Sequence, residues 1–85
     1  MLKPSPHVVL TKSQDAAVLL DKRSGSYYRL NPLAVAVYEG LAAGTSQQAV
    51  VEELQARFPD ARERIEGDVA RLIASLRSAR LLADA

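Results

Sequence analysis

The chain has 85 residues, a length that supports one domain with a single modest core, and 48% of these residues are apolar. It contains no cysteine, which excludes a disulfide framework, thiolate chemistry and cysteine-ligated zinc, and no apolar run reaches the roughly 18–20 residues needed to span a membrane. The formal net charge of +1 supplies no strong positive field for nucleic acid, so we expect a cytoplasmic protein without a membrane or nucleic-acid partner.

The N-terminal half is predicted to form strands. Two prolines indicate a flexible arm over residues 1–6, and the β-rich runs that follow predict strands at 7–11 and 16–21, separated by a polar turn. The second of these strands carries apolar residues on both faces, Val18 and Leu20 on one and Ala17 and Leu19 on the other. This pattern predicts that the sheet is not fully exposed to solvent on its second side.

A third strand is predicted over residues 26–31. Tyr27 and Tyr28 favour strands, and Gly25 suits a tight turn before them. Asn31 and the proline that follows it end the strand and begin a helix, because Asn caps free N–H groups and Pro supplies the backbone angle of a first helical residue. Because this strand would be the last of the sheet, we expect an unpaired outer edge, which can bind an extended peptide.

From Asn31 onward the apolar period changes from two to about 3.6 and predicts three helices. The first ends at Gly44, the second runs from a capping box at Thr45 to about Phe58, and the third runs from a cap at Asp60 to about Leu82. The predicted fold is α+β, with a three-stranded antiparallel sheet followed by three helices in one domain over residues 7–82. The last two helices resemble a helix-turn-helix with the sheet as its wing.

The residues that usually carry catalysis do not form a recognisable set. His7 is the only histidine, the glycines are isolated, and the carboxylates are interleaved with arginines as on a solvated helix surface. We therefore expect no enzyme activity, no metal and no cofactor. A small winged-helix DNA-binding protein is the alternative, although its third helix has mixed charges where phosphate contacts usually need a denser basic face.

The third predicted helix has a seam of small and apolar residues, Leu72, Ser75 and Ala79, between its core stripe and a polar flank. The flank consists of Arg64, Asp68, Arg71, Ser75 and Ser78. Small residues let another backbone approach closely. If the seam faces the third strand, the gap between them is a groove in which a peptide adds as a fourth strand.

The order and spacing of these residues resemble the PqqD-like family. The resemblance lies in a Gly-x-Tyr-Tyr-x-Leu-Asn run, a helix that ends in Gly, and an Asp-x-x-x-Leu-x-x-x-Leu run in the last helix. The residues concerned are Asp21, Gly25, Tyr28, Leu30, Asn31, Tyr38, Gly44, Asp68, Leu72, Leu76, Leu81 and Leu82. The chain departs from the pattern at Arg80, since relatives often have Gly before the final pair of leucines.

The resemblance implies a stand-alone recognition element for ribosomally synthesised and modified peptides, similar to the free recognition proteins of lasso-peptide clusters. Such proteins bind the leader of a precursor peptide as an extra antiparallel strand. They present it to a cysteine-protease-like leader peptidase and an asparagine-synthetase-like cyclase. Carried over to this sequence, the strand wall of the site is Tyr27, Tyr28, Arg29 and Leu30, and the helix wall is Asp68, Arg71, Leu72 and Ser75.

Overall fold

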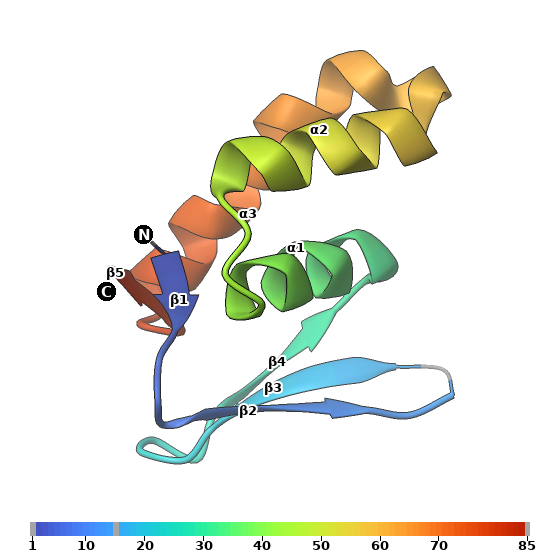
Figure 1. Cartoon of the computed structure of the whole chain (residues 1–85). Helices are drawn as coiled ribbons and strands as arrows, with labels where there is room; N and C mark the ends of the chain where they lie inside the picture. Colours follow the sequence, from blue (N-terminus) through green and yellow to red (C-terminus); the bar gives the residue numbers. More distant parts are fainter. Residues whose placement is uncertain (1, 15, 85) are drawn as a thin grey trace.

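The computed structural model describes residues 2–14 and 16–84. It has the α+β fold that the sequence predicts, with an antiparallel sheet and three helices (Figure 1). The elements in chain order are β1 (Leu2–Pro4), β2 (Val8–Lys12), β3 (Ala17–Asp21), β4 (Tyr27–Leu30), α1 (Pro32–Ala42), α2 (Gln47–Arg57), a 3-10 turn (Pro59–Ala61), α3 (Arg62–Ser78) and β5 (Leu82–Asp84). Helix α1 lies between the sheet and the α2–α3 pair, and it packs against both layers.

Strands β2, β3 and β4 form the predicted three-stranded antiparallel sheet, in that order. The central strand carries Leu19, which is fully buried and lies opposite Leu10 of β2 and Tyr28 of β4. Gly25 has a φ of 76° in the turn before β4, a left-handed conformation that glycine adopts without steric cost. The turn residue predicted from the sequence is therefore the one that leads the chain into β4.

Helix α1 begins as predicted, and helix α2 begins one residue later than expected. The Asn31 side chain accepts a hydrogen bond from the Ala34 N–H at 2.8 Å, and Pro32 is the first helical residue. Ser46 caps α2 by accepting from the Ala49 N–H at 3.1 Å. The predicted cap at Thr45 is therefore wrong. Thr45 and Ser46 are adjacent and both suit a cap, and the helix uses Ser46.

Helix α3 also begins later than predicted. The sequence predicts a cap at Asp60, but Pro59–Ala61 forms a separate 3-10 turn and the helix starts at Arg62. No side chain caps this end, where Ala61 is the flanking residue. The proline fixes the backbone of a tight turn before the helix, so Asp60 is inside that turn and the capping prediction is wrong.

The helix α3 ends at Ser78, four residues before its predicted end. Arg80 has a φ of 62°, the Arg80 N–H donates to the Arg77 carbonyl at 3.0 Å, and the Leu81 N–H donates to the Leu76 carbonyl at 2.8 Å. This is the Schellman arrangement, in which a left-handed residue reverses the chain and satisfies the last carbonyls of a helix. The chain then turns back as β5, so the predicted continuation of the helix is wrong.

Arg80→Gly is expected to stabilise the domain by about 0.5–1 kcal/mol, because glycine takes the left-handed conformation without the Cβ clash of other residues. The gain is measured as a higher urea midpoint, and it corresponds to a rise of several degrees in Tm for a domain of this size. The arginine is exposed, so its side chain contributes little packing. An unchanged or lower midpoint would contradict the strain that we assign to this residue.

The N-terminal segment is part of the fold over its described residues. Strand β1 pairs antiparallel with β5, with Lys3 opposite Ala83, and this pair brings the two ends of the chain side by side (Figure 1). Residues 2–6 are thus not the arm that the two prolines predict. A proline is compatible with an edge strand because its missing N–H costs no ladder hydrogen bond there.

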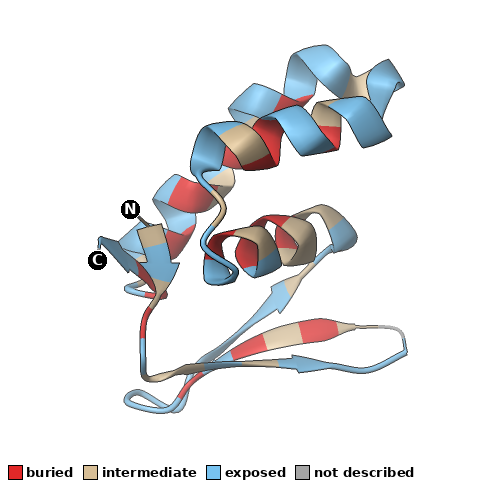
Figure 2. Cartoon of the chain, in the orientation of Figure 1, coloured by how far each residue is buried: buried red, intermediate tan, exposed pale blue. Residues whose placement is uncertain are grey.

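The core lies between the sheet and α1 and continues between the helices (Figure 2). Aliphatic residues supply most of it, as the low aromatic content predicts. The largest fully buried side chains are Leu19, Val37, Leu41, Val69 and Leu81. The end of the chain therefore contributes to the same core as the central strand.

Candidate functional site

Strand β4 is one edge of the sheet, and no strand within residues 2–14 and 16–84 pairs with its outer side. The Asp21 N–H donates to the Ser26 carbonyl at 2.8 Å, so this is a hydrogen-bonded pair of the β3–β4 ladder. Such pairs alternate with non-bonded pairs along an antiparallel ladder. The backbone groups of Tyr28 therefore bond to β3, whereas the N–H and C=O groups of Tyr27 and Arg29 point outward.

The turn before β4 is held by Asp21. Its carboxylate accepts the Arg23 N–H at 2.9 Å and lies 3.6 Å from Nε2 of His7. Burial raises the pKa of Asp21, but hydrogen bonds from Arg23 and Ser24 and the charge of His7 outweigh it and leave the pKa below the ordinary 3.8. The carboxylate thus stabilises the turn at neutral pH, and this contribution is lost as the pH falls from 3.8 through the lowered pKa.

An apolar surface lies on the helix side of β4. Tyr28 shares a face with the buried Leu19 opposite it, yet 38% of Tyr28 is exposed. Leu72 of α3 is half-buried and packs against the same core. Helix α1 packs against both β4 and α3, so the strand and the helix rest on a common support. Strand β4 and helix α3 thus each carry a partly exposed apolar side chain.

The predicted helix wall lies along one face of α3. Asp68 is three residues from Arg71 and four from Leu72, and Ser75 is four from Arg71 and three from Leu72, the spacings of neighbours on a helix surface. Asp68 and Arg71 form an ion pair, with side-chain exposures of 36% and 75%. An exposed pair of this kind contributes little to stability, so both charges are available to a charged ligand.

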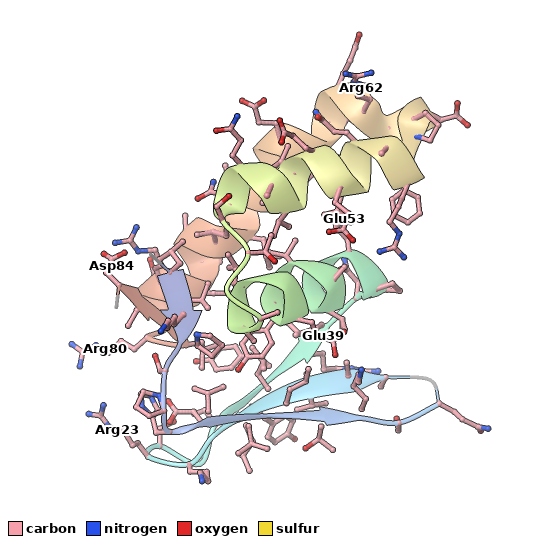
Figure 3. All side chains as sticks on the ribbon, viewed as in Figure 1. Arg23, Glu39, Glu53, Arg62, Arg80 and Asp84 are labelled. Atoms are coloured by element: carbon pink, nitrogen blue, oxygen red, sulfur yellow. The ribbon has the colours of Figure 1, made fainter. Side chains whose placement is uncertain are left out.

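Leu30 lies in a different place from the other predicted strand-wall residues. It lines a groove of about 680 Å³ between α1, α2 and the β2–β3 hairpin, and none of the helix-wall residues lines that groove. Lys12 and Glu39 form an ion pair across it at 2.7 Å. Glu39 and Glu53 come from α1 and α2 (Figure 3). The structure thus separates Leu30 from the helix wall.

The second side of the sheet carries an exposed apolar row. Val9, Leu20 and Tyr27 lie opposite one another across the three strands and are 40%, 38% and 68% exposed. We call these three residues the outer row. Val18, on the same side, is half-buried, so this side is not fully exposed, although the outer row itself is open. Apolar residues on both faces of β3 signalled the row, but they did not show that it would be open.

The described residues contain no group of three or more His, Asp or Glu side chains placed to hold a metal ion. In the same part of the chain, no helix combines the length and the apolarity needed to cross a membrane.

Comparison with known proteins identifies the family. The profile of the family described as Coenzyme PQQ synthesis protein D (PqqD) matches residues 16–82, well over half of the chain. The chain belongs to the PqqD family. This confirms the resemblance found from the Tyr-Tyr strand and the Asp-Leu-Leu pattern of α3. No curated protein sequence gives a significant match.

Two solved structures resemble this PqqD-family chain over nearly its whole length. One is a lasso peptide synthetase B1 complexed with the leader peptide, with a TM-score of 0.87, 29% identity and coverage of 98% of both chains. The other is TbiB1 in complex with the TbiA(β) leader peptide, with a TM-score of 0.84, 27% identity and coverage of 96% of this chain and 99% of that one. Both similar proteins were thus solved with a leader peptide bound.

Proposed function

We propose that the protein binds the leader segment of a ribosomally synthesised precursor peptide as a strand added to β4. The observation that carries the proposal is the free edge at Tyr27 and Arg29, whose backbone groups point outward. Main-chain hydrogen bonds along such an edge supply affinity, and alternate side chains supply specificity. The two leader complexes that resemble this chain support the same function.

In the proposed complex the leader runs antiparallel to β4 and lies against α3. Side chains of the leader that point toward the helices contact the half-open Tyr28 and Leu72. Its other side chains lie beside Tyr27 and Arg29 on the outer side of the sheet. Arg29 and Arg71 are exposed, so acidic leader residues suit both walls. Asp68 completes the helix wall. Leu30 shares a face of β4 with Tyr28 and would contact the leader only at the end of the strand, beside the separate groove that it lines.

The direct test is titration of the protein with a labelled synthetic leader of the precursor encoded in the same biosynthetic cluster. We expect a Kd of about one micromolar or lower, equivalent to about 8 kcal/mol of binding free energy. Fluorescence anisotropy measures it, and a scrambled peptide of the same composition is the control. Equal binding of the two peptides, or binding of neither, would overturn the proposal.

The protein acts by presentation and has no catalytic role in this proposal. It brings the bound leader to a cysteine-protease-like peptidase and then to an asparagine-synthetase-like cyclase in the cytoplasm, in the synthesis of a lasso peptide. The outer row of Val9, Leu20 and Tyr27 supports such docking, because an exposed apolar patch marks an interaction surface. Tyr27 also belongs to the free edge, so the peptidase would meet the leader and the outer row together.

Leu20→Glu is expected to lower the rate of leader removal by at least about tenfold, because a charge in the centre of the outer row opposes apolar docking. Leader affinity measured by anisotropy stays the same, since Leu20 is on the central strand. The rate is measured by mass spectrometry with the peptidase encoded in the same cluster. Ala70→Glu, on the exposed surface of α3 away from the helix wall, is the control. Equal rates for the two variants would exclude the outer row as the docking surface.

The finer description of the fold as a winged helix-turn-helix is also a proposal. Helices α2 and α3, joined by the 3-10 turn, would be the helix-turn-helix, and the sheet would be the wing. A gel shift with random duplex DNA at physiological salt tests the alternative function of DNA binding. We expect no shift at protein concentrations that saturate the leader, and a clear shift would favour the alternative.

A further inference from the structure

We propose that Ser5, together with the β1–β5 pair, positions α3 relative to the central sheet and so holds the leader-binding groove at its working width. This inference rests on the function proposed above. It assigns Ser5 as a positioning residue, since it touches neither wall of the groove. We call Ser5 with β1 and β5 the terminal clasp.

Ser5 joins the end of α3 to the beginning of the central sheet. It is a buried polar residue, 5% exposed. Its hydroxyl donates to the Arg80 carbonyl at 2.8 Å and its N–H donates to the Leu81 carbonyl at 3.0 Å. Its own carbonyl accepts the Val8 N–H at 3.1 Å. One residue therefore contacts the turn that ends α3 and the first residue of β2.

The two walls of the proposed groove belong to the two parts that Ser5 joins. The strand wall is on β4, which is connected to β2 through the ladders of the sheet. On the helix wall, Leu72 and Ser75 lie within the last two turns of α3, close to Ser78 where the helix ends. A displacement of this helix end would therefore move the helix wall relative to β4.

The terminal clasp is a short ladder whose buried residues are Ser5 and Leu82. It consists of three residue pairs between β1 and β5, the hydrogen bonds of Ser5, and an exposed ion pair between Arg77 and Asp84 at 3.0 Å. Asp84 and Arg80 lie at the same margin of the domain, beside β5 (Figure 3). Short terminal ladders with exposed ion pairs open more readily than a core. In the open state that the inference invokes, Leu82 is exposed while the sheet and the three helices stay folded.

An opening of the clasp would weaken leader binding. If only the closed state holds the groove at the right width, the apparent Kd rises by the inverse of the closed fraction. Ser5→Ala removes the hydrogen bond to the Arg80 carbonyl, which is part-buried, and leaves that carbonyl without this donor. Loss of one hydrogen bond changes the open–closed equilibrium by about three- to tenfold, so we expect this variant to bind the synthetic leader measurably more weakly, by up to about tenfold.

The matched control is Ser46→Ala. It also replaces a serine hydroxyl by hydrogen and removes one hydrogen bond, from the Ala49 N–H to the cap of α2. Ser46 is on neither wall and outside the clasp. We expect Ser46→Ala to lower the urea midpoint about as much as Ser5→Ala and to bind the leader as the unaltered protein does. Equal affinities of the two variants would overturn the proposal.

A disulfide across the clasp provides a second test that does not depend on the stability of Ser5→Ala alone. Lys3 and Ala83 are directly opposite and both exposed, and the bond between Ser5 and Leu81 in the same register makes them a hydrogen-bonded pair. Their expected Cα separation of about 5.5 Å suits a disulfide. The chain has no other cysteine, so Lys3→Cys with Ala83→Cys gives one possible bridge.

Added to Ser5→Ala, the bridge is expected to restore the affinity of the unaltered protein when oxidised and to lose it again when reduced. Affinity that is independent of the redox state would overturn the role of the clasp. Failure of the unaltered protein to bind the leader would instead overturn the proposed function itself. The two failures are thus distinguishable in one set of titrations.

Discussion

Arg29→Pro is expected to weaken leader binding by at least about 30-fold, about 2 kcal/mol, while the domain stays folded. The Arg29 N–H points away from β3, so the ring removes a donor from the free edge and no hydrogen bond from the ladder. Anisotropy with the synthetic leader measures the affinity, and circular dichroism and a urea titration report folding. A folded variant with unchanged affinity would exclude strand addition at β4.

Two controls separate the backbone of Arg29 from its charge and from its position. Arg29→Ala keeps the N–H, so it is expected to lose only the part of the affinity that the guanidinium supplies. Lys12→Pro removes an outward N–H from the opposite edge of the sheet, where the hydrogen-bonded pair of Ser13 and Ala16 sets the alternation. It is expected to leave binding unchanged. If Lys12→Pro abolishes binding instead, the leader adds to β2.

Ser75→Tyr is expected to reduce leader affinity by at least about tenfold, or about 1.4 kcal/mol. Ser75 is exposed and shares a face of α3 with Asp68 and Leu72. A small residue there leaves room for the backbone of the leader, and a ring of tyrosine size would occupy that room. Isothermal titration calorimetry measures both the affinity and the fraction of active protein.

The control for this substitution is Ala70→Tyr, which introduces the same ring at an exposed alanine of the same helix. Position 70 is about 140° from Ser75 around the axis and is not three or four residues from any helix-wall residue, so this ring is directed away from the helix wall. We expect its leader affinity and its urea midpoint to match those of the unaltered protein. Equal losses in both variants would show that the ring acts through stability and not through the groove.

The third strand and its limits were predictable because every local signal agrees there. Gly25 suits the turn, Tyr27 and Tyr28 favour the strand, and Asn31 with Pro32 both end the strand and begin α1. Agreement of several independent preferences over a few residues is the condition under which sequence reasoning succeeds. The edge position of β4 was predictable because it is the last of three strands that hairpins connect in sequence.

The two ends of the chain could not be predicted in the same way. Strands β1 and β5 have three residues each and pair with one another from opposite termini, so neither has a local pattern of its own. Leu81 and Leu82 follow Leu76 by five and six residues and so fall outside the apolar stripe of α3, a sign of the helix end that the prediction did not use. The left-handed residue there is Arg80, where a glycine would have signalled the stop.

The candidate site was predictable in its strand wall more than in its helix wall. Alternation along β4 predicts that Tyr28 and Leu30 share one face and Tyr27 and Arg29 the other, and the register confirms this. Which face of α3 is turned toward the groove depends on the distance that α1 sets between the sheet and the α2–α3 pair. No local sequence pattern encodes that distance. The assignment of the eight wall residues therefore stays a prediction that Arg29→Pro and Ser75→Tyr test.

The pairing of β1 with β5 makes the chain nearly circular. The first and last described residues, Leu2 and Asp84, are opposite one another, on a different strand pair from the free edge of β4. A host polypeptide can therefore enter and leave this domain at almost the same point. The same geometry makes the domain suitable for insertion into a surface loop of a larger enzyme, with its peptide-recognition edge still exposed.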